Sequence, residues 1–189
     1  MPLKENASEI RESWAGLSKR LSPNKHYDAH STCCYVFWKG TLMLRGIDPL
    51  LGPELLSCLR AMGHGDEIAI VDANFPAARE ARLLIRLDDA SAPRAVRAVL
   101  SVLPLGTFVD CAAFRMEVVS APEEIPEIAQ EFQRIIRESD ATVAPLGALE
   151  RFAFYDRVRQ AFAVVATGER RLYGNIILKK GILPPDQDV

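Results

Sequence analysis

Hydrophobic positions after residue 42 repeat in two patterns, one helical and one extended. A helix is predicted from Gly52 and Pro53 to about Met62, because proline suits a first helical turn and Gly63 suits the end. Ser91 is expected to cap a second helix, which Pro104 stops. Two more helices are predicted over residues 125–138 and 147–160. Apolar residues recur at helical spacing, as in Leu55, Leu56, Leu59 and Met62, in Val96, Val99, Leu100 and Leu103, and in Ile128, Phe132, Ile135 and Ile136.

Short apolar runs between these helices predict strands. Residues 68–73 form a nearly continuous run, as expected of a strand covered on both faces. The other predicted strands cover residues 83–87, 107–110, 115–120, 142–145, 162–167 and 175–180, and residues 75–80 are expected to form a loop or short helix. Helices interleaved with apolar strands indicate a single layered α/β domain, with a mostly parallel or mixed central sheet and flanking helices.

Residues 1–42 differ from the rest of the chain. After a helix expected over residues 9–20, residues 26–42 show no hydrophobic period. We interpret residues 1–42 as an N-terminal extension that is not native, translated from an upstream start codon, and residues 43–189 as the functional domain. The native protein is therefore expected to begin near Met43 in an intact-mass measurement, and a full-length native species would contradict this interpretation.

Charge and composition narrow the classes of function. The 189 residues carry a net charge of −2 and have a pI of about 6.0, so neither nucleic acid nor an anionic membrane is an expected partner. No apolar run reaches the length of a membrane span, and charges near the N-terminus interrupt any secretory signal. Adjacent cysteines such as Cys33 and Cys34 are poorly placed to pair with each other, and no CxxC motif occurs. Reduced thiols in a cytoplasmic protein are therefore expected.

Two titratable residues flank the strand predicted over residues 68–73. His64 stands between two glycines before the strand, and imidazole can both give and take a proton near neutral pH. The alternative is a surface histidine at a helix end, where the helix dipole favours positive charge. Asp72 stands at the far end of the strand, where open α/β sheets bind ligands. The alternative there is a loop carboxylate that caps the next turn.

Two further groups carry side chains that suit a polar ligand. Arg151 and Tyr155 lie one turn apart on a predicted helix and share a face. Arginine donates in a fixed fork and tyrosine can exchange a proton, although an ordinary amphipathic helix would show the same spacing. Tyr173, Gly174 and Asn175 place a glycine between two hydrogen-bonding side chains, which would let the backbone approach a ligand. A β-turn that enters the last strand is the alternative.

Other site patterns are excluded or weak. Gly63 and Gly65 do not form a dinucleotide fingerprint, because Ile68 stands at the third glycine position and the glycines precede the strand. Neither a phosphate-binding P-loop nor a GxSxG nucleophile elbow is present. A candidate zinc group has the spacing H-x3-H-x2-C-C, which departs from standard arrangements; it consists of His26, His30, Cys33 and Cys34. We therefore expect no metal and no cofactor.

Two long segments together resemble the D-ribose pyranase/fucose mutarotase superfamily, and its L-fucose mutarotase branch in particular. The first runs from Met62 to Pro76, and the second comprises residues 150–155, 162–169 and 172–181. The similarity extends from Met43 to about Leu183, and residues 1–42 have no counterpart in it. The resemblance implies a ribose pyranase-like fold and an isomerase that interconverts the α and β anomers of a fucose-type monosaccharide by acid/base ring opening. It also implies a homo-oligomer with sites near subunit interfaces.

The resemblance assigns roles to individual residues. It implies that His64 is the catalytic acid/base and that Tyr155 is a second proton-transfer residue. It implies that the sugar is contacted by Asp72, Met116, Arg151, Tyr173, Gly174 and Asn175.

One departure leaves the exact sugar open. Gly106 stands where fucose mutarotases usually carry aspartate, and the segment after Pro76 is shorter than usual. The ribose branch resembles the chain at His64 and Asp72, but it has Tyr-Ala-Asn near its end and lacks the helix pattern of Arg151 and Tyr155, which favours a fucose-type sugar. The alternatives are D-ribose pyranase-type activity and a monosaccharide-binding or regulatory protein on the same fold.

Overall fold

The computed structural model describes residues 44–106, 111–140 and 142–183. The expected extension over residues 1–42, with its candidate zinc group, lies outside the described residues, as does the strand expected over residues 107–110. The described helices are α2 (Pro53–Ala61), α3 (Ala77–Glu80), α4 (Ala92–Leu100), α5 (Glu127–Ser139) and α6 (Arg151–Gln160). The strands are β1 (Glu67–Val71), β2 (Leu84–Leu87), β3 (Ala113–Met116), β4 (Gly147–Leu149), β5 (Ala163–Thr167) and β6 (Ile176–Lys179).

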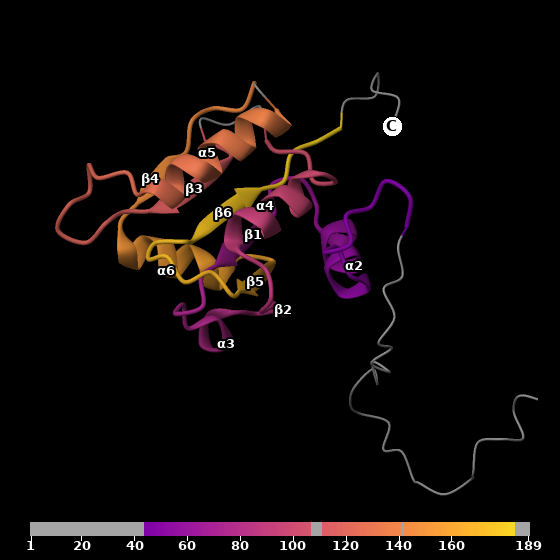
Figure 1. The fold of residues 1–189 in the computed structure, drawn as a ribbon, viewed down its shortest axis with the longest axis horizontal. Coiled ribbons are helices and arrows are strands. Elements are labelled where there is room, and N and C mark those ends of the chain that lie inside the picture. Colours follow the sequence, from indigo (N-terminus) through magenta and orange to yellow (C-terminus); the bar gives the residue numbers. More distant parts are fainter. Residues whose placement is uncertain (1–43, 107–110, 141, 184–189) are drawn as a thin grey trace, which may run out of the picture. The chain divides into compact units, whose positions relative to one another are not determined.

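These strands form one mixed sheet in the order β2-β5-β1-β6-β3-β4 (Figure 1). β1, β2 and β5 are parallel to one another, β3 is parallel to β4, and β6 runs antiparallel to both β1 and β3. Five strands therefore end at one edge of the sheet, where β6 begins. This carboxyl edge is the place where open α/β sheets bind ligands.

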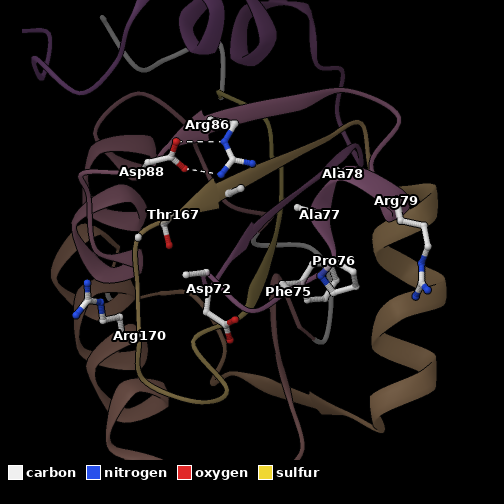
Figure 2. A pocket seen from close by; sticks show the side chains of 13 residues that line it. Asp72, Phe75, Pro76, Ala77, Ala78, Arg79, Arg86, Asp88, Thr167 and Arg170 are labelled. Carbon is white, nitrogen blue, oxygen red and sulfur yellow. Dashed lines mark hydrogen bonds and ion pairs between the residues drawn. The ribbon is translucent and has the colours of Figure 1, made fainter.

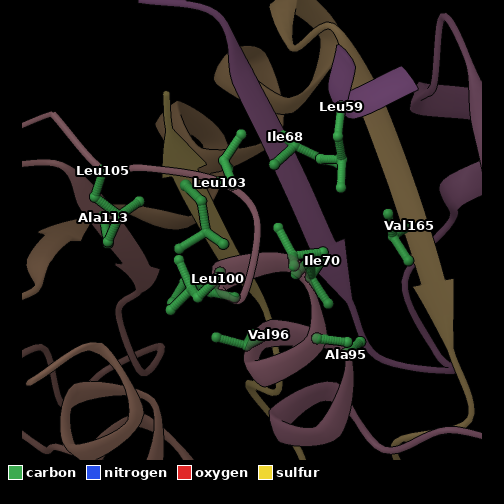
Figure 3. Packing of buried hydrophobic residues seen from close by; sticks show 14 of the residues in the cluster. Leu59, Ile68, Ile70, Ala95, Val96, Leu100, Leu103, Leu105, Ala113 and Val165 are labelled. Carbon is green, nitrogen blue, oxygen red and sulfur yellow. The ribbon is translucent and has the colours of Figure 1, made fainter. Parts of the chain in front are cut away.

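Helices cover both faces of the sheet. On one face α2, α4 and α5 pack over side chains such as Ile68, Ile70 and Val165, and Figure 3 shows this packing around α4. On the other face α3 and α6 cover Ala69, Val71 and Val164, with Phe154 of α6 fully buried. Because β1 alternates its side chains between two apolar layers, it carries a continuous hydrophobic run, as the sequence predicted. The predicted single α/β domain with a mixed central sheet is confirmed for the described residues.

Most of the predicted elements form close to their expected bounds. The Ser91 side chain caps α4 by accepting a hydrogen bond from the Arg94 N–H, and Pro53 occupies the first turn of α2. Residues 75–80, expected as a loop or short helix, contain the single turn of α3. No long apolar helix that could cross a membrane occurs among residues 44–106, 111–140 and 142–183.

Three predicted bounds are wrong. The strand expected over residues 115–120 ends at Met116, because a turn follows in which Ser120 adopts a φ of 67°. Residues 142–145 form no strand, and their place beside β3 is taken by β4. The last helix begins at Arg151, four residues later than predicted. Gly147 belongs to β4 instead, and a Cβ there would lie 2.7 Å from Cδ1 of Phe114.

Candidate active site

A cavity of about 260 Å³ lies at the carboxyl edge of the sheet, and we call it the Asp72 cavity. Its walls come from the residues after β1, the end of β3, the first turns of α6 and the turn before β6. Six of the eight predicted site residues line it: Asp72, Met116, Arg151, Tyr155, Tyr173 and Asn175. The remaining lining residues are Asn74, Phe75, Val119 and Leu172. Segments that are far apart in sequence thus meet as the resemblance implies.

Asp72 and Asn175 form a reciprocal pair at the base of the cavity. The Asn175 amide donates to Oδ2 of Asp72 at 2.8 Å, and the Asp72 N–H donates to Oδ1 of Asn175 at 2.9 Å. Burial raises the pKa of Asp72 above its ordinary value, against hydrogen bonds from the Asn74 N–H, the Asn175 amide and the N–H groups of Phe75 and Gly174. A carboxyl group with a raised pKa accepts a proton readily, so Asp72 can serve as a hydrogen-bond acceptor and hold a proton at its oxygen.

The aromatic wall of the cavity comes from α6 and the loop after β1. Tyr155 stacks on Phe75 with ring centroids 4.8 Å apart and planes 17° apart. Arg151 lies one helical turn earlier, with its guanidinium 5.9 Å from the centroid of the Tyr155 ring. Glu150 caps the helix by accepting from the N–H groups of Phe152 and Ala153, which fixes where α6 begins. The cavity therefore presents an apolar ring face beside a cation and a phenol.

The turn before β6 holds Tyr173 in an uncommon backbone conformation. Its φ is 59°, a left-handed value that costs free energy for a residue with a side chain. The phenol oxygen accepts a hydrogen bond from the Val119 N–H at 3.1 Å, which ties this turn to the loop after β3. Backbone strain of this kind persists where the surroundings fix it, so Tyr173 is held in place before any ligand arrives.

Gly174 serves packing inside this turn. A Cβ at this position would lie 2.9 Å from Cγ of Glu169 and 3.1 Å from Cδ1 of Ile128. Gly174 does not line the Asp72 cavity, although its N–H points at the Asp72 carboxylate. The predicted sugar contact at Gly174 therefore stays a prediction, and the close contacts give a steric reason for the glycine.

Glu169 stabilises the same turn through hydrogen bonds, and no role for it was predicted from the sequence. Its buried carboxylate accepts hydrogen bonds from the N–H groups of Arg170 and Arg171 and from the Arg171 guanidinium, which also reaches Glu131. The Glu169 carbonyl accepts from the Ala73 N–H, next to Asp72. The signal in the sequence was an acidic residue followed by two arginines in a short loop, a pattern that by itself indicates an exposed turn.

Replacing Glu169 by glutamine is expected to lower the free energy of unfolding by about 1–3 kcal/mol at pH 7, because several donors lose a charged acceptor. The Arg171 guanidinium holds the pKa of Glu169 below its ordinary value. A lowered pKa stabilises the fold above the unfolded pKa of about 4.3, and this contribution is lost as the pH falls through the folded value. Urea unfolding from pH 7 to pH 3 measures this difference, which should shrink with acidification.

The exposed pair of Arg86 and Asp88 supplies the matched control for this prediction. Replacing Asp88 by asparagine removes the same kind of charge outside the turn and should change stability little. An unfolding difference for the Glu169 variant that stays constant across the pH range would contradict the ionic role of Glu169.

A second cavity of about 510 Å³ shares Asp72 and Phe75 with the Asp72 cavity, and its other walls come from α3, β2 and the end of β5 (Figure 2). Of its three basic residues, Arg79 and Arg86 already pair with Glu80 and Asp88, and Arg170 is the third. The Asp72 cavity is smaller but gathers a carboxylate, an amide, a guanidinium and two phenols. It is therefore the better equipped to bind a small polyhydroxylated molecule.

His64 lies at the opposite edge of the sheet from Asp72. It is exposed in the turn between α2 and β1, and the five residues of β1 span about 16 Å at ~3.3 Å per residue. The turn is well held, because the Gly63 N–H donates to Asp66 and the Gly65 N–H donates to the Lys180 carbonyl. His64 therefore does not line the Asp72 cavity of the same chain.

Gly106 lies at the same edge as His64. Its N–H donates to the Lys179 carbonyl, and the neighbouring Leu105 bridges to Lys180. The position where the resemblance expects an aspartate thus lies at the edge of the sheet that carries His64, and not at the edge that carries Asp72. The predicted site residues fall into two groups on opposite edges of one sheet.

Fold and site define an α/β protein with a polar small-molecule cavity at the carboxyl ends of its strands. The chain belongs to the RbsD / FucU transport protein family, whose model matches residues 45–183.

Relatives and a solved structure of this family are similar to most of the chain. The human protein named fucose mutarotase is 46% identical over 146 residues, which cover 74% of this chain and 94% of that protein. L-fucose mutarotase of Histophilus somni strain 2336 is 38% identical over 142 residues, covering 75% and 99%. The crystal structure of the Streptococcus pneumoniae fucose mutarotase in complex with L-fucose matches with a TM-score of 0.69 at 41% identity, covering 75% of this chain and 100% of that one.

Proposed function

We propose that this protein is an L-fucose mutarotase, an isomerase that interconverts the α and β anomers of a fucose-type sugar. The observation that carries the proposal is the meeting of Asp72, Arg151, Tyr155, Tyr173 and Asn175 in one cavity. Relatives named fucose mutarotase, and a solved relative in complex with L-fucose, support the choice of reaction and sugar. The proposal includes a cytoplasmic location, which the free thiols of Cys58 and Cys111 support.

The proposed chemistry needs two proton transfers and no cofactor. Ring opening requires one group to protonate the ring oxygen and another to accept the proton of the anomeric hydroxyl. We assign the first role to His64 and the second to Tyr155, directly or through a water molecule. Asp72, Arg151, Tyr173 and Asn175 hold the sugar hydroxyls, while Met116 gives an apolar contact. General acid/base help of this kind contributes about 10²–10⁴-fold.

His64 can take this role only from a second copy of the chain. Its own Asp72 cavity lies at the other end of β1, so a neighbouring protomer must present His64 to the sugar. The rim of the Asp72 cavity supports such contact, because Val119, Leu172 and the nearby Phe152 are 52%, 69% and 71% exposed. Large apolar side chains gathered around a polar cavity are typical of an interface. We therefore propose a homo-oligomer whose sites are completed between subunits.

Saturation-transfer NMR over fucose, ribose, galactose and rhamnose tests the function. The expected result is the fastest enzyme-dependent anomer exchange with L-fucose. Faster pyranose–furanose exchange of ribose would assign the chain to the D-ribose pyranase type. Tight binding of a monosaccharide without exchange would instead identify a binding or regulatory protein, because binding needs Asp72, Arg151 and Asn175 but no proton transfer.

Replacing Tyr155 by phenylalanine separates proton transfer from packing. The variant keeps the ring that stacks on Phe75 and loses only the phenol oxygen. We expect exchange at saturating fucose to slow by about 10–100-fold, with the affinity for the sugar changed little. Replacing Phe162, a partly buried aromatic outside the cavity, by leucine is the control. Unchanged exchange in the Tyr155 variant would remove the residue from the reaction.

A further inference from the structure

A third cavity, of about 610 Å³, lies between α5 and the β3–β4 end of the sheet. Its polar lining comes mainly from Arg115 of β3 and from one side of α5, with Gln130, Gln133, Arg134 and Arg137. The apolar remainder includes Ile125, Ala129 and Leu146. Arg115 and Met116 are neighbours in β3, so their side chains point to opposite faces of the sheet, and this cavity is separate from the Asp72 cavity.

Arg115 is a buried cation that meets only neutral acceptors among the described residues. It is 7% exposed, and its guanidinium donates to the carbonyls of Met116 and Pro122 at 3.4 and 3.3 Å. No carboxylate of the described chain lies within ion-pair distance of it. Buried charges are ordinarily paired, because removing a charge from water is costly. An uncompensated guanidinium at a cavity wall therefore indicates an anionic occupant.

The rest of the wall is also rich in donors and poor in acceptors. Arg134 and Arg137 stand one turn apart on α5 and face the same cavity. Glu138 is the acidic residue of the lining, and Arg97 already binds its carboxylate at 2.6 Å. Gln133 uses its oxygen to accept from the Leu146 N–H, while its buried Nε2 has no acceptor in the described structure. Three arginines thus line one cavity, and its one lining carboxylate, that of Glu138, is already paired.

We propose that this cavity binds a phosphate group, either inorganic phosphate or the phosphate of a small monoester. The paired N–H donors of a guanidinium match the oxygens of phosphate. A phosphate dianion can accept hydrogen bonds from more guanidinium groups than a carboxylate can. The volume leaves room for a sugar-sized substituent beside Ile125 and Leu146. The site is independent of the proposed mutarotase reaction, since none of its residues lines the Asp72 cavity.

Calorimetric titration of the full chain tests the site, first with inorganic phosphate and then with L-fucose 1-phosphate, at constant ionic strength. Saturable binding of one phosphate per chain is expected, with a Kd on the order of 0.1 mM and with acetate at least ~10-fold weaker. Tighter binding of the sugar phosphate than of inorganic phosphate identifies the monoester as the ligand. Equal affinities identify free phosphate. A silent phosphate titration, or acetate that binds as well as phosphate, would overturn the proposal.

Variants locate the binding on these arginines. Replacing Arg115 by methionine keeps an apolar stem in the fold and should weaken phosphate binding at least ~10-fold. Replacing Arg134 by glutamine should weaken phosphate binding about threefold. Because Arg134 is exposed, this substitution does not disturb a buried position of the fold. Replacing Arg60, an exposed arginine of α2, by methionine is the control for net charge and should change nothing. Phosphate binding that survives both cavity variants would overturn the assignment. A second result would also overturn it: the unsubstituted protein binds no phosphate, and the Arg115 variant dissociates the oligomer. The occupant of the cavity would then be a second copy of the chain.

Discussion

Replacing His64 by glutamine is expected to slow exchange of L-fucose anomers by about 10²–10⁴-fold, the contribution of one positioned acid/base. The side chain is exposed in a turn held by backbone hydrogen bonds, so the substitution should leave the fold and its stability almost unchanged. Glutamine retains a hydrogen-bonding amide but cannot pass a proton at neutral pH. Saturation-transfer NMR at saturating fucose measures the rate, and a separate titration of fucose measures the affinity.

Replacing Arg60 by glutamine is the control for this prediction, because Arg60 is an exposed residue of the same helix–turn region. It should leave both rate and affinity unchanged. A folded His64 variant that retains the full exchange rate would end the assignment of His64 and leave the proton transfers to groups that line the cavity, namely Asp72, Tyr155 and Tyr173.

The sequence predicted the fold well where burial and periodicity coincide. β1 and β5 are apolar on both faces, and the helix capped by Ser91 presents one apolar stripe, so both patterns have a single interpretation. The prediction failed where an element is short and depends on contacts. β4 has three residues and exists because it pairs with β3, and the cap at Glu150 that separates it from α6 looks like an ordinary helical glutamate.

For the site as well, local sequence patterns predicted some residues, and contacts between distant segments determine the others. The place of Asp72 at the carboxyl edge of the sheet was predicted from an apolar run that ends at an acidic residue. The other polar residues of the cavity were predicted only from the family resemblance; they are Arg151, Tyr155, Tyr173 and Asn175. Phe75 and Leu172 were missed as lining residues because an apolar residue in a loop has no pattern that marks it as part of a wall. The separation of His64 from Asp72 was implicit in the sequence, because a strand must place its two ends at opposite edges of the sheet.

That separation makes a strong prediction for mixtures of two inactive variants. The His64→Gln chain keeps a complete Asp72 cavity, and an Asp72→Asn chain keeps His64 at the other edge. Each variant alone is expected to show only background exchange. If the site is completed between subunits, random co-assembly of equal amounts should restore about a quarter of the sites, those that combine an intact cavity with a neighbour's histidine.

Co-expression of the two variants with different affinity tags, followed by isolation of the mixed oligomer, allows this measurement. The doubly substituted chain co-assembled with itself is the matched control, because it carries both changes but cannot form an intact site. A mixed oligomer no more active than the two variants measured separately would contradict a shared site, and with it the assignment of His64 and Asp72 to the same reaction. Restored exchange would be difficult to explain otherwise, because the ~16 Å span of β1 prevents one chain from supplying both residues to a single sugar.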